Sequence, residues 1–296
     1  MKLEDIKKVA VIGAGNMGSG IAEVLSRLGG YQVTMSDSTK ELVDRGAKNQ
    51  RNMLQKFYVD KGKMTAAEME AILGRIKITT SNAEAASQAD FIVEAVFDNL
   101  DLKKKLFKEL DEAAPANAII VSNTSYLSVT EMAAQTKRAY KVAGMHFFNP
   151  PAVMKLVEVV SAALTSDETA KTVYDLALKL GKEPVRCRDV YGFLANRANI
   201  SENDAFELVW AHIATPADID KAVRLGFNRP LGPLELGDMI GSWSLRAHGE
   251  ADRIREFGWE RGHAHPLIKM IVRAGYTGGT GKKGIYDFWK DVLSKW

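Results

Sequence analysis

One histidine and one glutamate stand in neighbouring β-like runs, and together they could carry out acid–base chemistry. His146 ends the run KVAGMHFF, Glu158 lies inside the run MKLVEVV, and an Asn-Pro-Pro turn separates them. Two such runs should fold back on each other and bring the two side chains together. A carboxylate in an apolar strand is costly unless it is paired, and a histidine held by it is a suitable base for a hydroxyl proton. The same spacing also fits a core histidine beside an edge-strand acid.

The other histidines offer less chemistry. His212 lies on an expected helix, and His248, His263 and His265 lie in a charged region. Neither these residues nor the single cysteine, Cys187, follows the spacing of zinc ligands, so no metal site is expected.

A glycine-rich turn near the start predicts a dinucleotide site. The strand-like run KVAVI leads directly into a G-x-G-x-x-G turn, and a helix follows. Gly13 permits the tight turn, Gly15 lets a pyrophosphate approach the backbone, and Gly18 lets the helix pack closely on the strand. The free N–H groups and the partial positive charge of the helix N-terminus favour phosphate binding. The turn comprises Gly13, Ala14, Gly15, Asn16, Met17 and Gly18.

An acidic residue after the second strand indicates which dinucleotide binds. Asp37 follows the strand QVTMS and lies 19 residues after Gly18. A carboxylate at this position accepts hydrogen bonds from a ribose 2′-hydroxyl and repels a 2′-phosphate, so NAD is favoured over NADP.

Short β-rich runs alternate with helical stretches as far as about Val185, which indicates parallel strands with helical crossovers. Two of the helical stretches, the second opened by a capping box at Thr65 and Glu68, read as an insertion. The expected strands are Lys8–Ile12, Gln32–Ser36, Phe91–Val93, Ala118–Val121, Lys141–Met145 and Met154–Val160; the first expected helices are Ile21–Leu28 and Lys40 to about Tyr58.

The pattern changes to helices after about Gly192. Thr215 and Pro216 mark one clear helix start, with threonine as N-cap and proline at the first helical position. We therefore expect an α/β fold: a Rossmann-type doubly wound sheet with a helical insertion, followed by a smaller all-α C-terminal domain. The expected domains are residues 1–188, which bind NAD, and residues 189–296, which serve the substrate and dimerisation.

The composition excludes several classes of protein. The 296 residues carry 40 basic and 37 acidic side chains, a net charge of +3, which is too balanced to indicate nucleic acid or a membrane surface as a partner. The first residues do not resemble a signal peptide, and no apolar stretch is long enough to span a bilayer. A single cysteine fits a reducing compartment, so a cytoplasmic protein is expected.

Several longer motifs resemble the L-3-hydroxyacyl-CoA dehydrogenase family, including its short-chain 3-hydroxybutyryl-CoA members. They are VAVIGAGNMGSGIA, IVEAVFDNLDLKKKLFKEL, SNTSYLSV, AGMHFFNPPAVMKLVEVV, GFLANR and GFNRPLGPLELGDMIG. The resemblance implies an enzyme of fatty-acid metabolism that interconverts (S)-3-hydroxyacyl-CoA and 3-oxoacyl-CoA. Its cofactor would be NAD, its substrate a coenzyme A thioester, and its assembly a homodimer.

The resemblance also implies catalytic roles. His146 would be the general base and Glu158 the carboxylate that orients it. Ser125 and Asn196 would hydrogen-bond the reacting oxygen and help to place the substrate.

Further binding roles come from the same resemblance. Asp37 and the glycine turn would hold the cofactor, and Asp98, Lys103 and Asn149 would add contacts to it. Lys56 would meet the phosphates of coenzyme A, although a solvated lysine fits that position equally well.

Two segments depart from the family pattern. After Asn196 the chain is more polar than expected, with Asn199, Ser201, Glu202, Asn203 and Asp204, which puts the acyl-chain preference and the subunit contact in doubt. The glycine-rich GGTGKKGIY segment near the C-terminus is shifted relative to the family motif, so no cofactor contact carries over to it. Trp243 could lie near the substrate or in an ordinary helical interface.

Two other functions stay open at this stage. A related NAD-dependent dehydrogenase could act on a free hydroxy acid or a sugar acid, and this would show as activity without the thioester. A nicotinamide-binding protein without turnover would share the fold, but it would be expected to lack the base or its partner, and both His146 and Glu158 are present.

Overall fold

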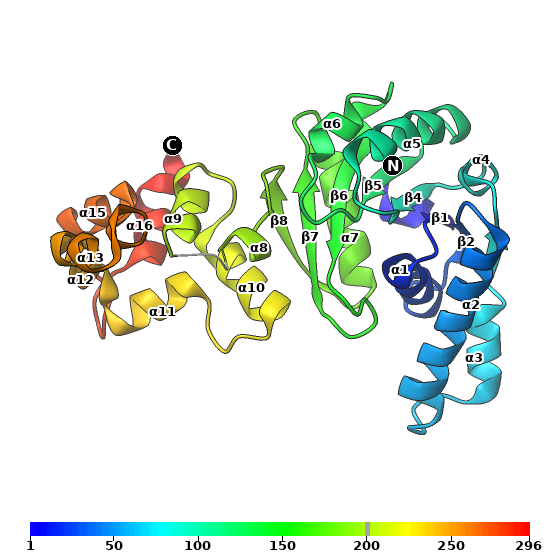
Figure 1. The fold of residues 1–296 in the computed structure, drawn as a ribbon, viewed down its shortest axis with the longest axis horizontal. Helices are drawn as coiled ribbons and strands as arrows, with labels where there is room; N and C mark the ends of the chain where they lie inside the picture. Colours follow the sequence, from blue (N-terminus) through cyan, green and yellow to red (C-terminus); the bar gives the residue numbers. More distant parts are fainter. Residues whose placement is uncertain (199–201) are drawn as a thin grey trace. The chain divides into compact units, whose positions relative to one another are not determined.

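The computed structural model describes residues 1–198 and 202–296, and it divides the chain into two compact units (Figure 1). The first unit is Met1–Tyr191 and the second is Gly192–Trp296. The expected division after residue 188 lies three residues before this boundary.

Within the described residues, the first unit contains an eight-stranded sheet with the order β3-β2-β1-β4-β5-β6-β7-β8. The β6–β7 pair is antiparallel and every other neighbouring pair is parallel. Helices on both faces make this a doubly wound sheet, so the expected fold class is confirmed. The strands are β1 (Lys8–Ile12), β2 (Gln32–Ser36), β3 (Ile76–Thr79), β4 (Phe91–Glu94), β5 (Ile119–Ser122), β6 (Val142–Phe147), β7 (Leu156–Ser161) and β8 (Glu183–Arg188).

The helices of the first unit lie on two sides of this sheet (Figure 1). Helices α1 and α7 pack on one face, over a core that includes Val9, Val33 and Val157. Helices α4 and α6 pack on the other face, with α5 beside them. The helices are α1 (Asn16–Arg27), α2 (Lys40–Leu54), α3 (Ala66–Leu73), α4 (Asn82–Ala86), α5 (Leu100–Ala113), α6 (Val129–Ala133) and α7 (Asp167–Lys179), with short turns η1 (Leu3–Asp5), η2 (Gln55–Val59) and η3 (Ala139–Lys141).

The helical insertion forms between β2 and β3. Thr65 accepts a hydrogen bond from the backbone N–H of Glu68, and the Glu68 carboxylate accepts one from the N–H of Thr65, which confirms the predicted capping box. Helix α2 ends at Leu54, earlier than expected, because the backbone changes to a wider π-helical turn in η2. A small core of its own closes the insertion around Leu54, Met69 and Ile72.

Two strands, β3 and β8, were not predicted from the sequence, and they form the two edges of the sheet. Strand β3 is a half-exposed IKIT run, and β8 alternates buried and exposed residues and contains Pro184. An edge strand pairs with only one other strand and is partly exposed to water, so its sequence is less apolar than that of a central strand.

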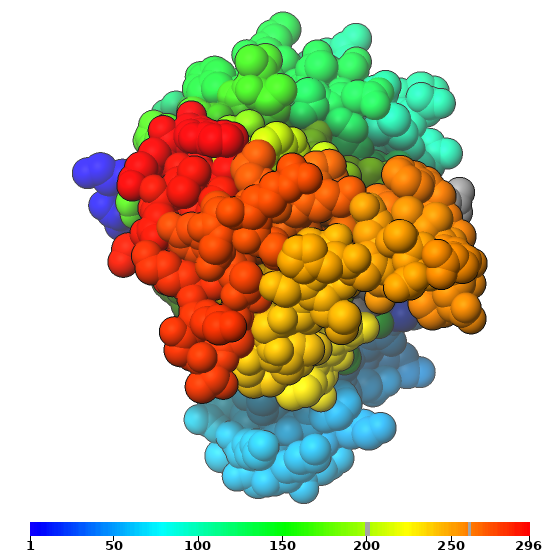
Figure 2. All heavy atoms as spheres, turned by 90° about the vertical axis from the view of Figure 1, so that its left-hand side faces the viewer, coloured from blue at the N-terminus to red at the C-terminus, as the bar shows by residue number. Residues whose placement is uncertain are grey.

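The second unit is helical throughout the part that the structure describes. Thr215 caps α10, with Pro216 in its first turn, as predicted. The yellow to red helices form one continuous packed body in Figure 2. They are α8 (Ala195–Ala198), α9 (Glu202–Trp210), α10 (Pro216–Phe227), α11 (Pro233–Ile240), α12 (Ser242–His248), α13 (Glu250–Phe257), α14 (Trp259–Gly262), α15 (Pro266–Arg273) and α16 (Ile285–Asp291), followed by the turn η4 (Leu293–Lys295).

Trp243 lies in the interior of this helical unit. Its ring is fully buried and meets Phe206 edge-on, and its Nε1–H donates a 2.6 Å hydrogen bond to Asp238. Packing within the unit therefore accounts for this tryptophan. Among the described residues, every helix is too short or too polar to cross a lipid bilayer.

Candidate active site

The antiparallel pairing of β6 and β7 brings His146 and Glu158 together. The two residues are directly opposite each other in the ladder. His146 Nδ1 lies 2.7 Å from Glu158 Oε2, and the two side chains are 4% and 0% exposed. In the tautomer that donates its Nδ1–H to this carboxylate, the Nε2 lone pair is the acceptor.

Ser125 lies at the other side of the same imidazole. It stands in the loop after β5, and its Oγ is 3.0 Å from His146 Nε2. The side chain of Asn123 supports this arrangement, because its Oδ1 accepts a hydrogen bond from the N–H of Phe147, 2.9 Å away. The ring of Phe148 lies against the imidazole, with 4.6 Å between ring centroids. Glu158, His146 and Ser125 thus form a continuous chain of polar contacts from the core to the loop.

The glycine-rich turn has the geometry that its glycines suggest. Gly13 has a φ of +107°, where side chains are strained, and a Cβ on Gly18 would come within 1.9 Å of the Gly13 carbonyl oxygen. A Cβ on Gly15, in contrast, would meet no atom within 4 Å. The backbone at Gly15 is therefore open to a ligand, directly at the N-terminus of the 12-residue helix α1.

Asp37 lies at the carboxyl end of β2, beside that turn. Its Oδ2 accepts a hydrogen bond from the Ala14 N–H at 2.8 Å, so the carboxylate has a fixed place. A cleft of about 530 Å³ opens here and is lined by Gly13, Gly15, Asp37, Leu42 and Phe97, among others. Apolar walls, an acid and an open glycine backbone fit the adenosine half of a dinucleotide, at the edge of the sheet where such folds bind ligands.

Lys103 is buried, and its ammonium group forms ion pairs with two neighbouring carboxylates. Its side chain is 1% exposed, and Nζ lies 2.5 Å from Glu94 Oε1 and 3.2 Å from Asp98 Oδ1. Ser122 donates a 2.6 Å hydrogen bond to the other oxygen of Glu94. Glu94 is not among the predicted site residues, although an acid that ends the apolar run FIVE carries the same signal that identified Glu158.

Asn149 and Lys56 lie near a second opening at this side of the unit. Asn149 is exposed and lines a cleft of about 290 Å³ together with Asn16 and Ser19 of α1 and with Phe57 of η2. The Nζ of Lys56 lies 5.7 Å from the Phe57 ring centroid. The amides of Asn16 and Asn149 and the hydroxyl of Ser19 make this cleft suitable for a polar ligand.

The remaining predicted positions lie in the second unit. Asn196 is half-buried in α8. Of the polar segment after it, Asn199 and Ser201 fall outside the described residues. Glu202 forms an ion pair with Arg246 at 3.0 Å, and the Asn203 amide donates to the His263 carbonyl oxygen at 3.0 Å. These two polar residues therefore have partners inside the helical unit.

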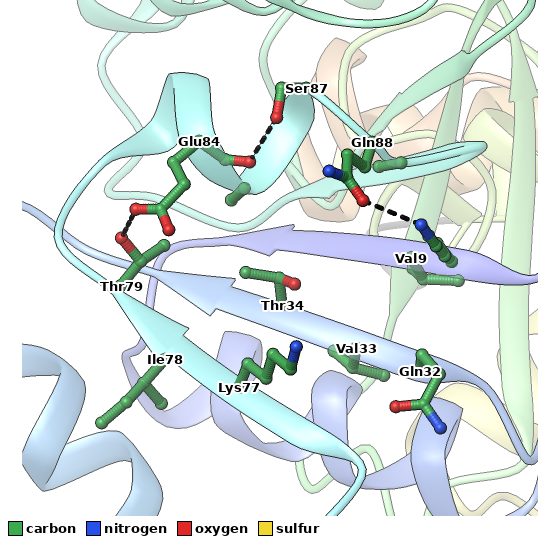
Figure 3. A pocket seen from close by; sticks show the side chains of 13 residues that line it. Val9, Gln32, Val33, Thr34, Lys77, Ile78, Thr79, Glu84, Ser87 and Gln88 are labelled. Atoms are coloured by element: carbon green, nitrogen blue, oxygen red, sulfur yellow. Dashed lines mark hydrogen bonds between the residues drawn. The ribbon is translucent and has the colours of Figure 1, made fainter.

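Another cleft, of about 330 Å³, lies over β1, β2 and β3. Figure 3 shows Gln32, Thr34 and Lys77 on its strands, and Glu84 and Gln88 on the segment that crosses them. It extends toward the amino-terminal ends of β1 and β2, whereas ligands of doubly wound sheets bind at the carboxyl ends. We therefore leave it outside the candidate site. Among residues 1–198 and 202–296, no group of three histidine, cysteine or acidic side chains is placed to hold a metal ion.

Comparison with known proteins gives consistent results for both units. The family model described as 3-hydroxyacyl-CoA dehydrogenase, NAD binding domain, matches residues 8–190. The model described as 3-hydroxyacyl-CoA dehydrogenase, C-terminal domain, matches residues 192–288.

Individual relatives cover nearly the whole chain. A probable 3-hydroxybutyryl-CoA dehydrogenase of Bacillus subtilis is 40% identical over 96% of this chain and 98% of its own length. A 3-hydroxyadipyl-CoA dehydrogenase of Escherichia coli is 38% identical over 96% of this chain and 59% of its own length. The solved structure of (S)-3-hydroxybutyryl-CoA dehydrogenase from Ralstonia eutropha is 38% identical, covers 95% of this chain and 98% of that chain, and has a TM-score of 0.65.

Proposed function

This chain belongs to the 3-hydroxyacyl-CoA dehydrogenase family and is an NAD-dependent oxidoreductase of 3-hydroxyacyl-CoA thioesters, and we propose that His146 is its general base. The observation that supports this proposal is the chain of contacts from Glu158 through the imidazole to Ser125. It combines a buried acid, an oriented ring and a hydroxyl donor, which is the arrangement that proton transfer to and from an alcohol requires.

The proposed reaction moves a proton and a hydride from one secondary alcohol. NAD, when bound, supplies the hydride acceptor at C4 of its nicotinamide. His146 Nε2 takes the proton of the 3-hydroxyl, and Glu158 stabilises the imidazolium that forms. Ser125 donates a hydrogen bond to the reacting oxygen. In the reverse direction His146 returns the proton to the developing alkoxide, which completes the (S)-3-hydroxyacyl-CoA product.

The proposed cofactor contacts follow the geometry of the turn. The backbone at Gly15 and the start of α1 would hold the pyrophosphate, and Asp37 would accept from the adenosine ribose and exclude NADP. Asn149 would lie toward the nicotinamide end. Asp98 and Lys103 remain predicted contacts; the burial of Lys103 favours an effect through Glu94 and the backbone at Val96, whose carbonyl oxygen accepts from Nζ at 3.0 Å.

The substrate contacts are proposals of the same kind. Lys56, whose Nζ lies 5.7 Å from the Phe57 ring centroid, would face coenzyme A. Asn196 would help to place the acyl group.

A homodimer remains part of this proposal. Apolar side chains stay exposed along α11 and α12, namely Leu236, Met239, Ile240 and Leu245. A second copy of the chain would remove them from water. Light scattering coupled to gel filtration tests this directly, since the mass of one chain is 32.5 kDa. The cytoplasmic location expected from the single cysteine stays a prediction.

One assay tests the proposed reaction. NADH oxidation is followed by absorbance with acetoacetyl-CoA, with longer and dicarboxylic 3-oxoacyl-CoA substrates, and with the free 3-oxo acids. We expect turnover of thioesters and at least a tenfold preference for NADH over NADPH, since Asp37 repels the extra phosphate. Turnover of free acids at the same rate would contradict thioester specificity, and equal use of NADPH would contradict the role of Asp37.

A further inference from the structure

The loop between β6 and β7 connects the strands that carry His146 and Glu158. It begins at Phe148 and places Asn149 at the surface, while Pro151 is buried. Pro150 holds the loop internally, because its carbonyl oxygen accepts the N–H groups of Val153 and Met154 at 3.0 Å. Other carbonyl oxygens of the loop accept hydrogen bonds from partners elsewhere in the unit.

Lys182 supplies such partners from beneath the loop. It follows α7, directly before β8, and is only 6% exposed. Its Nζ donates hydrogen bonds to the carbonyl oxygens of Pro151 and, at 2.9 Å, Met154. One ammonium group therefore holds two points of the same turn, and hydrogen bonds from a charged donor are stronger than those between neutral groups.

The same ammonium lies near two charged residues of α1. Glu23 is fully buried and pairs with Arg27 one turn later, and the Arg27 guanidinium stacks 4.4 Å from the Tyr58 ring centroid. The pKa of Lys182 lies at about 8, below its ordinary value of 10.5, because burial and the nearby charge of Arg27 lower it more than Glu23 raises it. Burial also raises the pKa of Glu23, against the influence of Arg27 and Lys182. The two charges of α1 thus act on this ammonium in opposite directions, Arg27 disfavouring its charged form and Glu23 favouring it.

A close backbone contact brings the loop onto α1 itself. A Cβ on Gly20 would lie 3.1 Å from both Cγ and Cδ of Pro151, tighter than ordinary van der Waals contact. Glycine at this position lets the proline ring rest on the helix. Because α1 begins at the glycine-rich turn, the position of the loop is defined relative to the element that would bind the pyrophosphate.

We propose that Lys182 is a positioning residue, which fixes the β6–β7 loop against α1 and so holds Asn149 at the nicotinamide end of the bound cofactor. Asn149 and Asn16 line the same cleft from the loop and from α1, which is the arrangement that this clamp would maintain. The inference rests on the proposed function, and it adds a residue far from the reacting atoms that controls where the hydride acceptor lies.

A lysine suits this role for a physical reason. Its side chain is long enough to reach the loop from the start of β8, and its ammonium offers three donors to carbonyl oxygens. A buried ammonium is expensive to desolvate. The hydrogen bonds to the two carbonyl oxygens offset that cost.

The test compares Lys182→Met with Lys155→Met. The first removes the donors but keeps a similar chain length, and the second removes an exposed lysine of the same loop, 3.6 Å from Glu183. Turnover of acetoacetyl-CoA is measured together with the dissociation constants of NADH and of AMP, which probes only the adenosine end. Displacing a positioned group by about 1 Å costs up to a hundredfold in rate. We expect Lys182→Met to lower kcat by roughly tenfold and to raise the dissociation constant of NADH severalfold. AMP binding should be unchanged, and Lys155→Met should behave as the wild type.

A purely structural role predicts a different result. Lys182→Met would then lower the unfolding temperature, while kcat and the NADH constant, measured well below that temperature, would match the wild type. This outcome would overturn the proposal. If Lys182→Met does not fold, Gly20→Ala provides the test, because it keeps Lys182 but displaces Pro151. We expect Gly20→Ala to weaken NADH binding and to leave AMP binding unchanged. Unchanged NADH binding would overturn the proposal that the position of the β6–β7 loop controls the cofactor.

Failure of the proposed function would look different again. A wild-type protein that binds NADH but does not turn over any 3-oxoacyl-CoA would contradict the assigned reaction. The NADH and AMP constants of the variants would still decide whether Lys182 positions the loop.

Discussion

The two units of the chain use buried carboxylates for different purposes. In the sheet unit, Glu158 and Glu94 face side chains that can exchange or carry a proton, namely His146 and Lys103. In the helical unit, Asp220 is 2% exposed and accepts from the backbone N–H groups of Leu234 and Glu235 at 2.9 and 2.6 Å, at the start of α11. The same chemical group therefore contacts the proposed base or a buried lysine in one unit and caps a helix in the other.

The difference arises from what surrounds each acid. Asp238 repeats the capping pattern, since its Oδ1 accepts from the Ile285 N–H at 2.8 Å and from Trp243. Helix N-termini offer unsatisfied N–H groups, and an acid that fills them is fully used by the fold. Within a strand the backbone N–H groups pair with the neighbouring strands, so a buried acid such as Glu158 takes a side-chain partner. Replacing members of each cluster should therefore affect activity in the first unit and stability in the second.

The largest effect is expected for His146→Gln. Loss of the general base should lower turnover by at least about a hundredfold, while the NADH dissociation constant and the unfolding temperature stay close to the wild-type values. Steady-state kinetics with acetoacetyl-CoA, cofactor titration and thermal unfolding measure the three quantities. An unchanged rate would remove His146 from the mechanism.

Glu158→Gln should reduce turnover less, by about ten- to a hundredfold, because an amide can still contact Nδ1 but cannot stabilise the imidazolium as a carboxylate does. The matched control in the other unit is Asp238→Asn, which should leave turnover within about twofold while lowering the unfolding midpoint. If Glu158→Gln loses stability but keeps full activity, the role of Glu158 is structural, like that of Asp238, and not catalytic.

Asp220 should make the stability of the helical unit depend on pH. Burial raises the pKa of Asp220 to about 6 from 3.8. Because the folded pKa is the higher one, the stabilising contribution is complete below pH 4 and is lost as the pH rises through 6. We expect the free energy of unfolding to fall by about 2 kcal/mol between pH 4 and pH 7 from this group.

Tryptophan fluorescence during urea unfolding measures this effect, since all five tryptophans lie in the second unit. Asp220→Asn should remove this component of the pH dependence. If the variant and the wild type show the same slope with pH, the titration of Asp220 does not contribute.

The smallest effect is expected for Tyr286→Phe. The Tyr286 hydroxyl donates a 2.6 Å hydrogen bond to Asp220, and its loss should cost about 1 kcal/mol of unfolding free energy. The pH at which the stability falls should also rise, because this hydrogen bond holds the pKa of Asp220 below the value that burial alone would give. Urea unfolding at several pH values measures both changes, and a loss of turnover would contradict the separation between the units.

Local patterns were sufficient to predict the central elements of the fold. The apolar runs of β1 and β2 have the predicted bounds, and the capping signals at Thr65 and Thr215 mark real helix starts. These features depend on hydrophobic period and on hydrogen bonds within four residues, which a single sequence contains. The edge strands β3 and β8 were missed because their stability comes from pairing with a neighbour distant in sequence.

The candidate site divides in the same way. His146, Glu158 and the glycine turn were found because their residue types are unusual for the strands and turns where they stand. Lys182 was not singled out, because a lysine just before a strand looks solvated until the fold buries it. Glu94 was also missed, although it ends the apolar run FIVE and its signal was available in the sequence.

By itself, the sequence determined which groups could react and the strand pair that would carry them, because strand alternation and a proline turn are local properties. Only the tertiary structure decided which charges lose water and which partner each one meets. Lys103 and Lys182 become buried, and Asp220 becomes a cap, through contacts between segments far apart in the chain. Desolvation, which changes the energetics of such groups, depends on the complete packing around them.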